Sequence, residues 1–413
     1  MFMEYNALLR KLPIGIQTFE KLRKGNYLYV DKTAFVWRIA NTGKSYFLSR
    51  PRRFGKSLLL STFEAYFEGK KELFKGLAIE NMETEWKRYP VLHLDLNAEK
   101  YDSPERLENF LNSQLNIWEN RFGRDVRENT LSIRFFGIIR RASEQAGCGV
   151  VVLVDEYDKP LLQALGNDAL LEDYRKTLNA FYSVLKSADR YLHFVFLTGV
   201  TKFSQDSLSG DLNQLNDISM KPQYTTVCGI TRTELIETFA LEIEEFGRVN
   251  ELSAEETVDK MARQYDGYHF HPKGDGVFNP FSVLNAFSKR ELGDYWFQTG
   301  TPTFLVEILQ KSEYDLRTLL NGIEAPSSMF SEYRVEANNP IPLIYQSGYL
   351  TIKDYDKEFG NYLLQFPNDE VRYGFINFLV PFYTSMTNSD QGAVHPSRSE
   401  ECRRSCRCDS KDP

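Results

Sequence analysis

A lysine and a serine with the spacing of a nucleotide phosphate site lie at positions 56 and 57. The segment RPRRFGKS at 50–57 follows the apolar run YFL at 46–48 and leads into LLL at 58–60. This order predicts a strand, a loop and a helix that starts at Gly-Lys-Ser. In such a loop backbone N–H groups bind phosphate oxygens, the lysine reaches the β- and γ-phosphates, and the serine hydroxyl ligates Mg²⁺. The predicted nucleotide-binding residues are Arg50, Arg52, Arg53, Phe54, Gly55, Lys56, Ser57 and Leu58.

The first position of this segment departs from the full pattern, G-x-x-x-x-G-K-[ST], because Arg50 stands where the pattern has glycine. Glycine is used where a loop needs positive φ or a close backbone approach. We therefore expect the loop to differ in shape. Taken alone, Gly-Lys-Ser fits a plain helix N-terminus equally well. Arg52 and Arg53 either contact phosphate as forked donors or are solvated loop charges.

Two carboxylates follow a second apolar run, VVVLV at 150–154. The run predicts a strand buried on both faces, and it ends at Asp155 and Glu156. Parallel α/β sheets place their ligands at the carboxyl ends of strands. We predict that Asp155 holds Mg²⁺ together with Ser57 and that Glu156 polarises the attacking water. The alternative is an exposed turn before Pro160, which the order of the two motifs along the chain disfavours.

A third strand, HFVFL at 193–197, ends at Thr198. In P-loop ATPases with an additional strand, a polar residue at this point contacts the γ-phosphate or the water. Thr198 is therefore the second predicted catalytic residue, with a plain strand-terminal threonine as the alternative. The segment 29–32 either covers the adenine or supplies Asp31 as the N-cap of a helix through Trp37.

Strands and helices alternate along the first half of the chain. Strands are predicted at 27–30, 46–48, 91–96, 150–154, 193–197 and 225–229, and helices at 105–122, 131–145 and 172–186. This alternation predicts an α/β fold, with a parallel sheet, helices on both faces and right-handed crossovers.

A mainly helical region is expected from residue 230 onward. Capping boxes at 231–234 and 253–256 each open a helical pattern. This region fits a lid, in which Arg263 either reaches the nucleotide or is a solvated charge. A small α+β region follows, with a strand pair at 341–353 and 362–366. The histidines at 269 and 271 are expected in a packed loop without metal.

Composition limits the class of protein. A chain of 413 residues with 42% hydrophobic content can bury the cores of two or three domains. The net charge of −7 does not demand a nucleic-acid partner. No membrane-length apolar run or signal-peptide pattern is visible, so we expect a cytoplasmic protein. Cys148 and Cys228 are expected to be reduced core residues, and the cysteines at 402, 406 and 408 lack zinc-site spacing.

The expected organisation has four parts. They are an ATPase core with its N-terminal segment (1–229), a helical lid (230–335), the start of a truncated C-terminal region (336–387) and a tail (388–413). The tail loses apolar periodicity and is rich in Ser, Arg, Cys and Asp, so we expect it to be disordered. Its abrupt change of composition suggests a frameshift.

The chain resembles a bacterial and archaeal family that joins an AAA-ATPase-like domain to a C-terminal PD-(D/E)XK nuclease-like domain. The matching phrases are YVDKT at 29–33, RPRRFGKSL at 50–58, LVDEYDKP at 153–160, TGVTKF at 198–203 and YWFQTGTP at 295–302. The resemblance covers residues 8–386 and implies ATP and Mg²⁺ as ligands. It also implies the additional-strand, AAA-like P-loop NTPase type of the predicted α/β fold, and that arginine at position 50 is a family trait.

The family's nuclease core would follow residue 386, and this chain shows no convincing counterpart. The metal-binding motif (D/E)-x-K occurs at 409–411 and 85–87, but at neither place does it lie on a predicted strand, as a nuclease site needs. We expect an ATP-binding protein and Mg²⁺-dependent ATPase that drives or gates a conformational change, coupled to a nuclease-like module in intact relatives. DNA would be a partner only through that module. The alternatives are a non-hydrolysing switch or interaction protein and an inactive truncated relative. A homo-oligomer is compatible with the sequence and undetermined by it.

Overall fold

The computed structural model of the protein describes residues 10–202, 214–299, 316–331 and 339–383. Its centre is a sheet of five parallel strands in the order β2-β3-β4-β1-β5. The strands are β1 Ser45–Ser49, β2 Val91–Asp95, β3 Val150–Asp155, β4 Leu192–Gly199 and β5 Asn216–Asp217. The predicted parallel α/β sheet is confirmed. Strand β4 lies between β1 and β3, the strands that lead to the predicted phosphate loop and to the two carboxylates.

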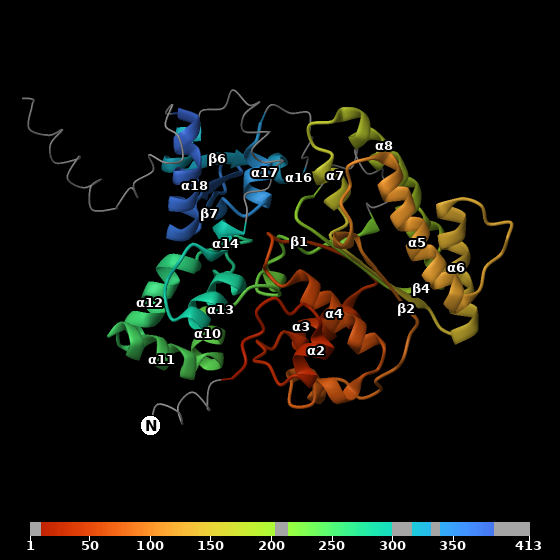
Figure 1. Ribbon diagram of the computed structural model, residues 1–413, viewed down its shortest axis with the longest axis horizontal. Helices are drawn as coiled ribbons and strands as arrows, with labels where there is room; N and C mark the ends of the chain where they lie inside the picture. Colours follow the sequence, from red (N-terminus) through yellow and green to blue (C-terminus); the bar gives the residue numbers. More distant parts are fainter. Residues whose placement is uncertain (1–9, 203–213, 300–315, 332–338, 384–413) are drawn as a thin grey trace, which may run out of the picture.

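Helices cover the sheet on both sides (Figure 1). On one side lie α2 Phe19–Lys24, α3 Thr33–Thr42 and α4 Lys56–Phe67; on the other lie α5 Pro104–Phe122, α6 Leu131–Ala146 and α8 Asp168–Tyr182. Two short helices, α7 Lys159–Gln163 and α9 Val184–Ser187, flank α8. Every residue of β3 is buried, as the apolar run at 150–154 predicts for a strand with helices on both faces.

Local sequence signals explain where these helices begin and end. Helix α6 starts after Thr130, whose hydroxyl accepts the Ile133 N–H. It ends at Gly147, which adopts the left-handed conformation (φ 64°) that a helix C-terminus favours. Short single turns of 3₁₀ helix complete the connections, at Lys71–Phe74, Ala78–Asn81, Leu96–Ala98, Asp189–Tyr191 and Pro222–Tyr224.

A helical region follows the sheet and has its own hydrophobic core. It contains α10 Arg232–Thr238, α11 Ala240–Asn250, α12 Ala254–Tyr265, α13 Pro280–Lys289 and α14 Tyr295–Gln298. Both predicted capping boxes are present, at the starts of α10 and α12. Phe239, Met261 and Phe287 are buried together in this core, and Leu28 joins them from the N-terminal segment. The N-terminal segment therefore links the parallel sheet to the helical region.

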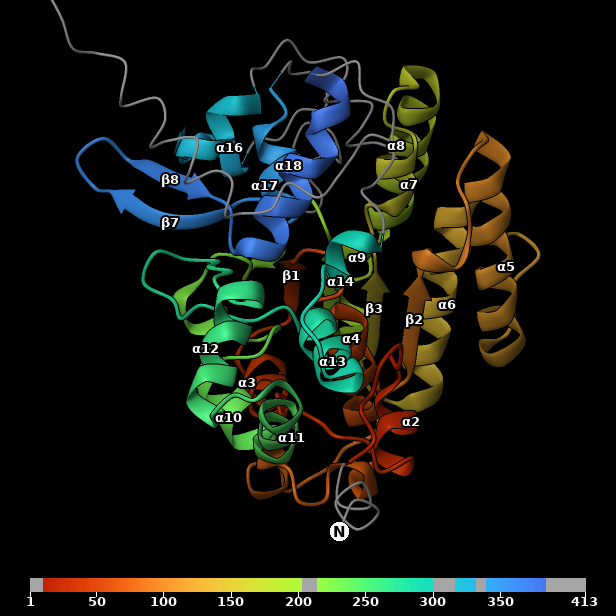
Figure 2. The same cartoon turned by 60° about the vertical axis from the view of Figure 1, so that its left-hand side comes forward.

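The described C-terminal residues form a small α+β unit. It contains β6 Ile323–Pro326, α16 Ser328–Ser331, α17 Ile341–Gln346, β7 Thr351–Asp356, β8 Asn361–Gln365, α18 Asp369–Tyr383 and a 3₁₀ turn at Leu316–Asn321. Its strands form an antiparallel sheet in the order β6-β8-β7. Buried residues such as Ile344 and Phe375 belong to the same hydrophobic cluster as the parallel sheet. Figure 2 shows this unit on the side toward which β2 and β3 point.

Two predicted strands are wrong, and a third is confirmed only in its last residues. Residues 225–229 form turns. The chain there lies against the loop at 50–57, and Gly229 (φ 88°) donates its N–H to the Phe54 carbonyl. The edge strand is instead β5. Residues 28–30 are irregular, and 27 forms only an isolated bridge to Lys11. Of the predicted strand at 341–353, residues 351–353 belong to β7, which pairs with β8 as predicted. Residues 341–346 are instead helical, because Pro340 and Pro342 favour a helix start.

Other boundaries shift by a few residues. Helix α8 starts at Asp168, earlier than predicted, because Asn167 caps it through a hydrogen bond from the Leu170 N–H. Helix α3 starts at Thr33, with Lys32 as its N-cap, although Asp31 still accepts the Thr33 N–H at 2.8 Å. The predictions for the tail, its cysteines and residues 300–305 lie outside the described residues.

Two expectations about the rest of the chain can be compared with the structure. Cys148 and Cys228 are free thiols, and Cys228 is buried as expected. Cys148 is only half-buried, so its expected place in the core is wrong. No helix among the described residues has the length and apolar character needed to cross a membrane.

Candidate nucleotide-binding site

The loop at 50–57 has two residues in the left-handed conformation, and Arg50 is not one of them. Positive φ occurs at Arg53 (67°) and Gly55 (94°). Gly55 is the N-cap of α4, and no atom lies within 4 Å of where its Cβ would be. Glycine is therefore needed there for its backbone conformation and leaves open space beside the loop. Since Arg50 does not use positive φ, the missing glycine carries no backbone cost.

The side chain of Arg50 lies in the protein core and supports the loop. It is 1% exposed. Its guanidinium donates to the carbonyls of Ser49 (2.8 Å), Ser219 (2.8 Å) and Tyr224 (3.0 Å), and it stacks on the ring of Phe270 at 3.8 Å. These contacts hold the loop to the segment after β5. The Arg50 guanidinium, which the sequence predicts to contact the nucleotide, thus donates to protein carbonyls instead.

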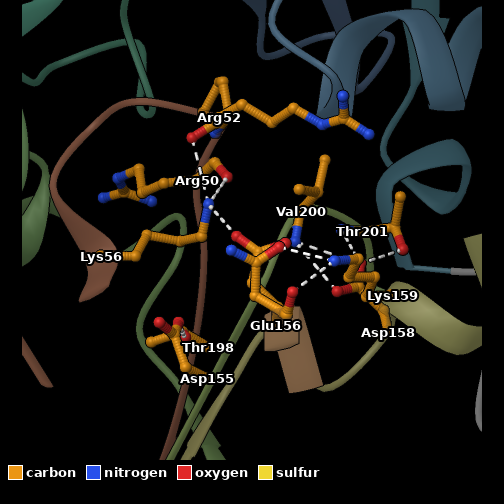
Figure 3. Close-up of polar contacts among 12 residues, drawn as sticks. Arg50, Arg52, Lys56, Asp155, Glu156, Asp158, Lys159, Thr198, Val200 and Thr201 are labelled. Atoms are coloured by element: carbon orange, nitrogen blue, oxygen red, sulfur yellow. Dashed lines mark hydrogen bonds and ion pairs between the residues drawn. The ribbon is translucent and has the colours of Figure 1, made fainter. Parts of the chain in front are cut away.

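The other predicted loop residues divide into exposed and buried side chains. Arg52 and Arg53 are exposed. The Arg52 side chain runs away from Lys56 (Figure 3), and the Arg53 guanidinium lies 4.8 Å from the ring centre of Phe281. Phe54 is buried with its ring edge-on to Tyr268 at 4.7 Å. The loop is therefore anchored by Phe54 and Arg50 while its tip faces outward.

Lys56 points into the loop and toward the predicted catalytic carboxylate (Figure 3). Its Nζ donates to the carbonyls of Arg50 (3.0 Å) and Pro51 (3.2 Å) and lies 3.3 Å from Glu156 Oε1. The lysine side chain is only 3% exposed. A buried ammonium group held by loop carbonyls is positioned to replace these contacts with phosphate oxygens.

Asp155 lies beside two hydroxyl groups, as the predicted Mg²⁺ site requires. Thr198 Oγ1 donates to Asp155 Oδ1 at 2.5 Å. Burial, followed by the nearby charge of Glu156, raises the pKa of Asp155, and hydrogen bonds from Ser57 and Thr198 oppose this. Ser57 and Asp155 therefore meet at one point, and oxygen ligands of this kind suit Mg²⁺. Their donor set fits the cation.

Glu156 adopts the left-handed conformation, which is unusual for a residue with a side chain. Its φ is 53°. Such strain is typical of residues that a fold holds in place for function. Here the turn places the carboxylate beside Lys56 at 3.3 Å. The exposed-turn alternative for this segment is wrong, because Tyr157 and Asp158 are buried at 3% and 0% exposure.

Asp158 fixes this turn against the end of β4, a role that the sequence analysis missed. Its carboxylate accepts the Val200 N–H (3.0 Å), the Thr201 N–H (2.6 Å) and the Thr201 hydroxyl (2.6 Å). Burial and the Glu156 charge raise the pKa of Asp158 to about 6. A Cβ on Gly199 would lie 2.6 Å from the Tyr157 ring, so glycine is required after Thr198.

An apolar cavity of about 100 Å³ opens beside Gly55. Its walls come from the loop and α4 (Phe54, Gly55, Leu58, Leu59), the N-terminal segment (Tyr29, Val30, Lys32) and the helical region (Phe239, Pro280, Leu284). Lys32 is held in place by Glu234 (2.6 and 2.7 Å) and by the Thr226 carbonyl (2.8 Å). Segment 29–32 thus borders this cavity while Asp31 binds the first N–H of α3.

A family model described as predicted AAA-ATPase matches residues 13–209. The chain is also 39% identical over 366 residues to an Azotobacter chroococcum mcd 1 protein named "Uncharacterized protein in vnfD 5'region", a match that covers 88% of this chain and 68% of that protein. The chain belongs to the predicted AAA-ATPase-like family. The matched part contains the loop at 50–57, both carboxylates and Thr198. Neither comparison names a nuclease domain.

In this AAA-ATPase-like chain, the helical region contacts the loop at 50–57 through Trp296. The Trp296 indole Nε1–H donates to the Arg52 carbonyl at 3.1 Å, and the Trp296 backbone N–H donates to Glu370 at 2.6 Å. Close by, a Cβ on Gly348 would lie 2.6 Å from Pro51, so glycine lets the C-terminal unit approach the loop. The signal in the sequence was the phrase at 295–302, although nothing in it specified this contact.

Another expectation is resolved by a surface contact. Arg263 is 76% exposed and pairs with Asp369 at 2.6 Å, so the solvated-charge alternative is the one observed. His269 contacts the Gly274 carbonyl through Nδ1. Among the residues that the structure describes, no group of three or more His, Cys, Asp or Glu side chains could hold a metal.

Glu370 is a buried carboxylate that joins three helices. It accepts the Ser282 hydroxyl of α13 (2.8 Å) and the Trp296 N–H of α14 (2.6 Å), and it belongs to the first turn of α18. Burial raises the pKa of Glu370 from 4.5 to about 8, with Asp294 adding to the effect and the hydrogen bonds opposing it. The folded protein therefore binds this proton more tightly than the unfolded chain does.

Stability should fall with rising pH because of Glu370. The stabilisation that the protonated Glu370 side chain gives to the folded state is complete below the ordinary glutamate pKa. It is lost as the pH rises through the raised pKa of Glu370. Between pH ~5.5 and ~8.5 we expect wild type to lose about 3 kcal/mol of unfolding free energy relative to Glu370→Gln, which mimics the protonated acid. Denaturant unfolding at both pH values measures this, with Glu358→Gln, an exposed residue, as the control. Equal pH slopes in wild type and Glu370→Gln would show the prediction to be wrong.

Proposed function

We propose that this protein binds ATP with Mg²⁺ at the loop of residues 50–57 and hydrolyses it. The observation that carries the proposal is the meeting of Lys56, Ser57, Asp155 and Glu156 at the carboxyl ends of the central strands, with Lys56 Nζ 3.3 Å from Glu156. Membership of the predicted AAA-ATPase family supports a nucleotide as the ligand. A passive helix N-terminus would not bring these four groups together.

Each residue has a distinct role in this proposal. Lys56 leaves the loop carbonyls to neutralise the β- and γ-phosphates. Ser57 and Asp155 hold Mg²⁺, which withdraws charge from the phosphate oxygens. Glu156 orients the attacking water. Thr198 keeps the Asp155 carboxylate in place through its 2.5 Å hydrogen bond and lies where it can also contact the γ-phosphate or that water.

Phosphate release from ATP tests the proposed activity. The full chain should release phosphate in the presence of Mg²⁺, and EDTA should abolish the release because Ser57 and Asp155 then have no cation to hold. Release that continues at an equal rate in EDTA would contradict the role of the cation. Binding without release would favour the non-hydrolysing switch.

The apolar cavity beside Gly55 is the proposed site of the adenine ring. Leu284→Trp should fill this cavity of about 100 Å³ and weaken ATP binding. The affinity for tripolyphosphate, which has no base, should stay unchanged. We expect about a tenfold loss for ATP, because the base loses its apolar contacts. Competition titrations measure both affinities, and Leu292→Trp, at a partly exposed leucine outside the cavity, is the matched control. An equal loss for both ligands would contradict this placement of the base.

We further propose that nucleotide binding moves the helical region, acting as a lid, and the C-terminal unit. The support is the Trp296–Arg52 hydrogen bond, which joins the loop to α14, and the Trp296–Glu370 hydrogen bond, which extends this connection to α18. A loop that changes its contacts on binding phosphate would alter the first bond directly. In relatives with a nuclease-like module, this connection would carry the signal toward that module.

A further inference from the structure

A second and larger cavity, of about 380 Å³, lies behind the phosphate loop. It is bounded by residues that follow β1 and β5 on one side and by the C-terminal α+β unit on the other. Its lining includes Arg50, Pro51 and Asp217 from the ATPase-like part and Phe330, Tyr345 and Tyr362 from the C-terminal unit. Among the residues that the structure describes, it shares no lining residue with the apolar cavity beside Gly55. A cavity of this size is typical of small-molecule sites.

Aromatic rings form much of the C-terminal wall of this second cavity. The ring of Phe330 lies edge-on to Tyr345 and to Tyr362, with both centroid distances at 4.8 Å. Phe270 faces the cavity from the helical region and carries the Arg50 guanidinium on its ring at 3.8 Å. Such walls favour a planar, apolar group in the ligand.

Positive charge dominates among the ionisable groups that line the cavity. Lys202 forms an ion pair with Asp217 at 2.7 Å, so these two charges offset each other. Lys221 and Arg50 also line the cavity, and among the described lining residues Asp217 is the acidic one. Arg50 Nε has no hydrogen-bond partner among the residues described here. The remaining charge therefore favours an anionic group.

We propose that this cavity binds a small anionic molecule with an aromatic ring. The ring would lie between Phe330, Tyr362 and Phe270. The anion would face Lys221 and Arg50 Nε, the guanidinium nitrogen that donates to none of the three carbonyls. The occupant would also touch the segment whose carbonyls, at Arg50 and Pro51, accept Lys56 Nζ. The site is separate from the proposed base cavity, so its existence does not depend on nucleotide binding.

Two fluorescent probes that share a ring system test the proposal on the full chain. They are the anionic 8-anilinonaphthalene-1-sulfonate and the uncharged N-phenyl-1-naphthylamine. Each probe is titrated into the wild-type protein in the presence of excess Mg-ATP, and the titration is repeated with the Lys56→Ala protein. The sulfonate should bind at one site and about tenfold more tightly than the uncharged probe. Equal affinity for both probes would overturn the anionic class of ligand.

Two variants locate the binding. Ser327→Trp places a large ring at the cavity wall and should abolish sulfonate binding. Lys221→Glu should weaken sulfonate binding about tenfold and leave the uncharged probe within about twofold. Lys357→Glu, an exposed residue in the turn between β7 and β8, is the matched charge control. The proposed site would be overturned if Ser327→Trp bound the sulfonate as wild type does. It would also be overturned if Lys221→Glu and Lys357→Glu changed the affinity for the sulfonate equally.

Discussion

Lys56→Ala is expected to weaken ATP binding by roughly 100-fold or more, about 2.7 kcal/mol of binding free energy. Lys56 is 3% exposed, and its ammonium group lies 3.3 Å from Glu156. Removing it leaves Glu156 and Asp155 as unbalanced negative charges facing the phosphates. Repulsion is then added to the loss of the lysine's own contacts.

A calorimetric titration with ATP at fixed Mg²⁺ measures this loss. Lys44→Ala is the matched control, because Lys44 lies just before β1 and pairs with Asp189 on the surface. Its affinity should equal that of wild type. Thermal unfolding of both variants separates lost binding from lost folding. A folded Lys56→Ala protein with wild-type affinity would remove Lys56 from the site.

Glu156→Gln should retain ATP binding and lower the rate of hydrolysis by roughly 100- to 1,000-fold. Glutamine keeps the size of the side chain and can occupy the same left-handed backbone position. It cannot polarise water as a carboxylate does, because the amide is a far weaker base. The change also removes one negative charge beside Lys56, so ATP affinity should be equal to or higher than that of wild type.

Phosphate release and calorimetry on the same preparation check both parts of this expectation. Glu172→Gln, at an exposed position on α8, should behave as wild type. Unchanged turnover in Glu156→Gln would move the catalytic role to another residue. If wild type itself binds ATP without turnover, the protein is a nucleotide-dependent switch and Glu156 has a structural role.

The central sheet and the loop were predictable because their signals are local. Apolar runs at 46–48, 150–154 and 193–197 each became a strand of the parallel sheet, and polar residues at their ends met at one edge. The register pairs Ser49 with Gly199 and Asp95 with Asp155, so strand ends distant in sequence are aligned in space. Periodicity and strand-end chemistry were sufficient for this part.

The role of Arg50 could not be predicted from the pattern. The pattern specifies glycine, and a departure from it indicates only that the loop differs. The structure shows that Arg50 bonds to Ser219 and Tyr224, about 170 residues away, and stacks on Phe270. The sequence analysis assigned no element to Ser219 or Tyr224, and it placed Phe270 in a packed loop. Long-range contacts of this kind leave no local periodicity to detect.

The same reason explains why Asp158 and Glu370 were missed as positioning residues. Asp158 was visible in the phrase at 153–160, but its donors at 200 and 201 follow a different strand. Glu370 depends on Ser282 and Trp296, which lie on two other helices. Burial of a carboxylate is a property of the packed fold, so sequence patterns could not indicate it.

Binding of ATP to the wild-type protein in the presence and absence of Mg²⁺ tests the central claim most directly. The arrangement of Lys56, Ser57 and Asp155 predicts one ATP per chain in calorimetry, with clearly tighter binding when Mg²⁺ is present. Absence of binding at millimolar ATP with Mg²⁺ would contradict the account. The loop at 50–57 would then be a structural turn anchored by Arg50, without a role in holding phosphate.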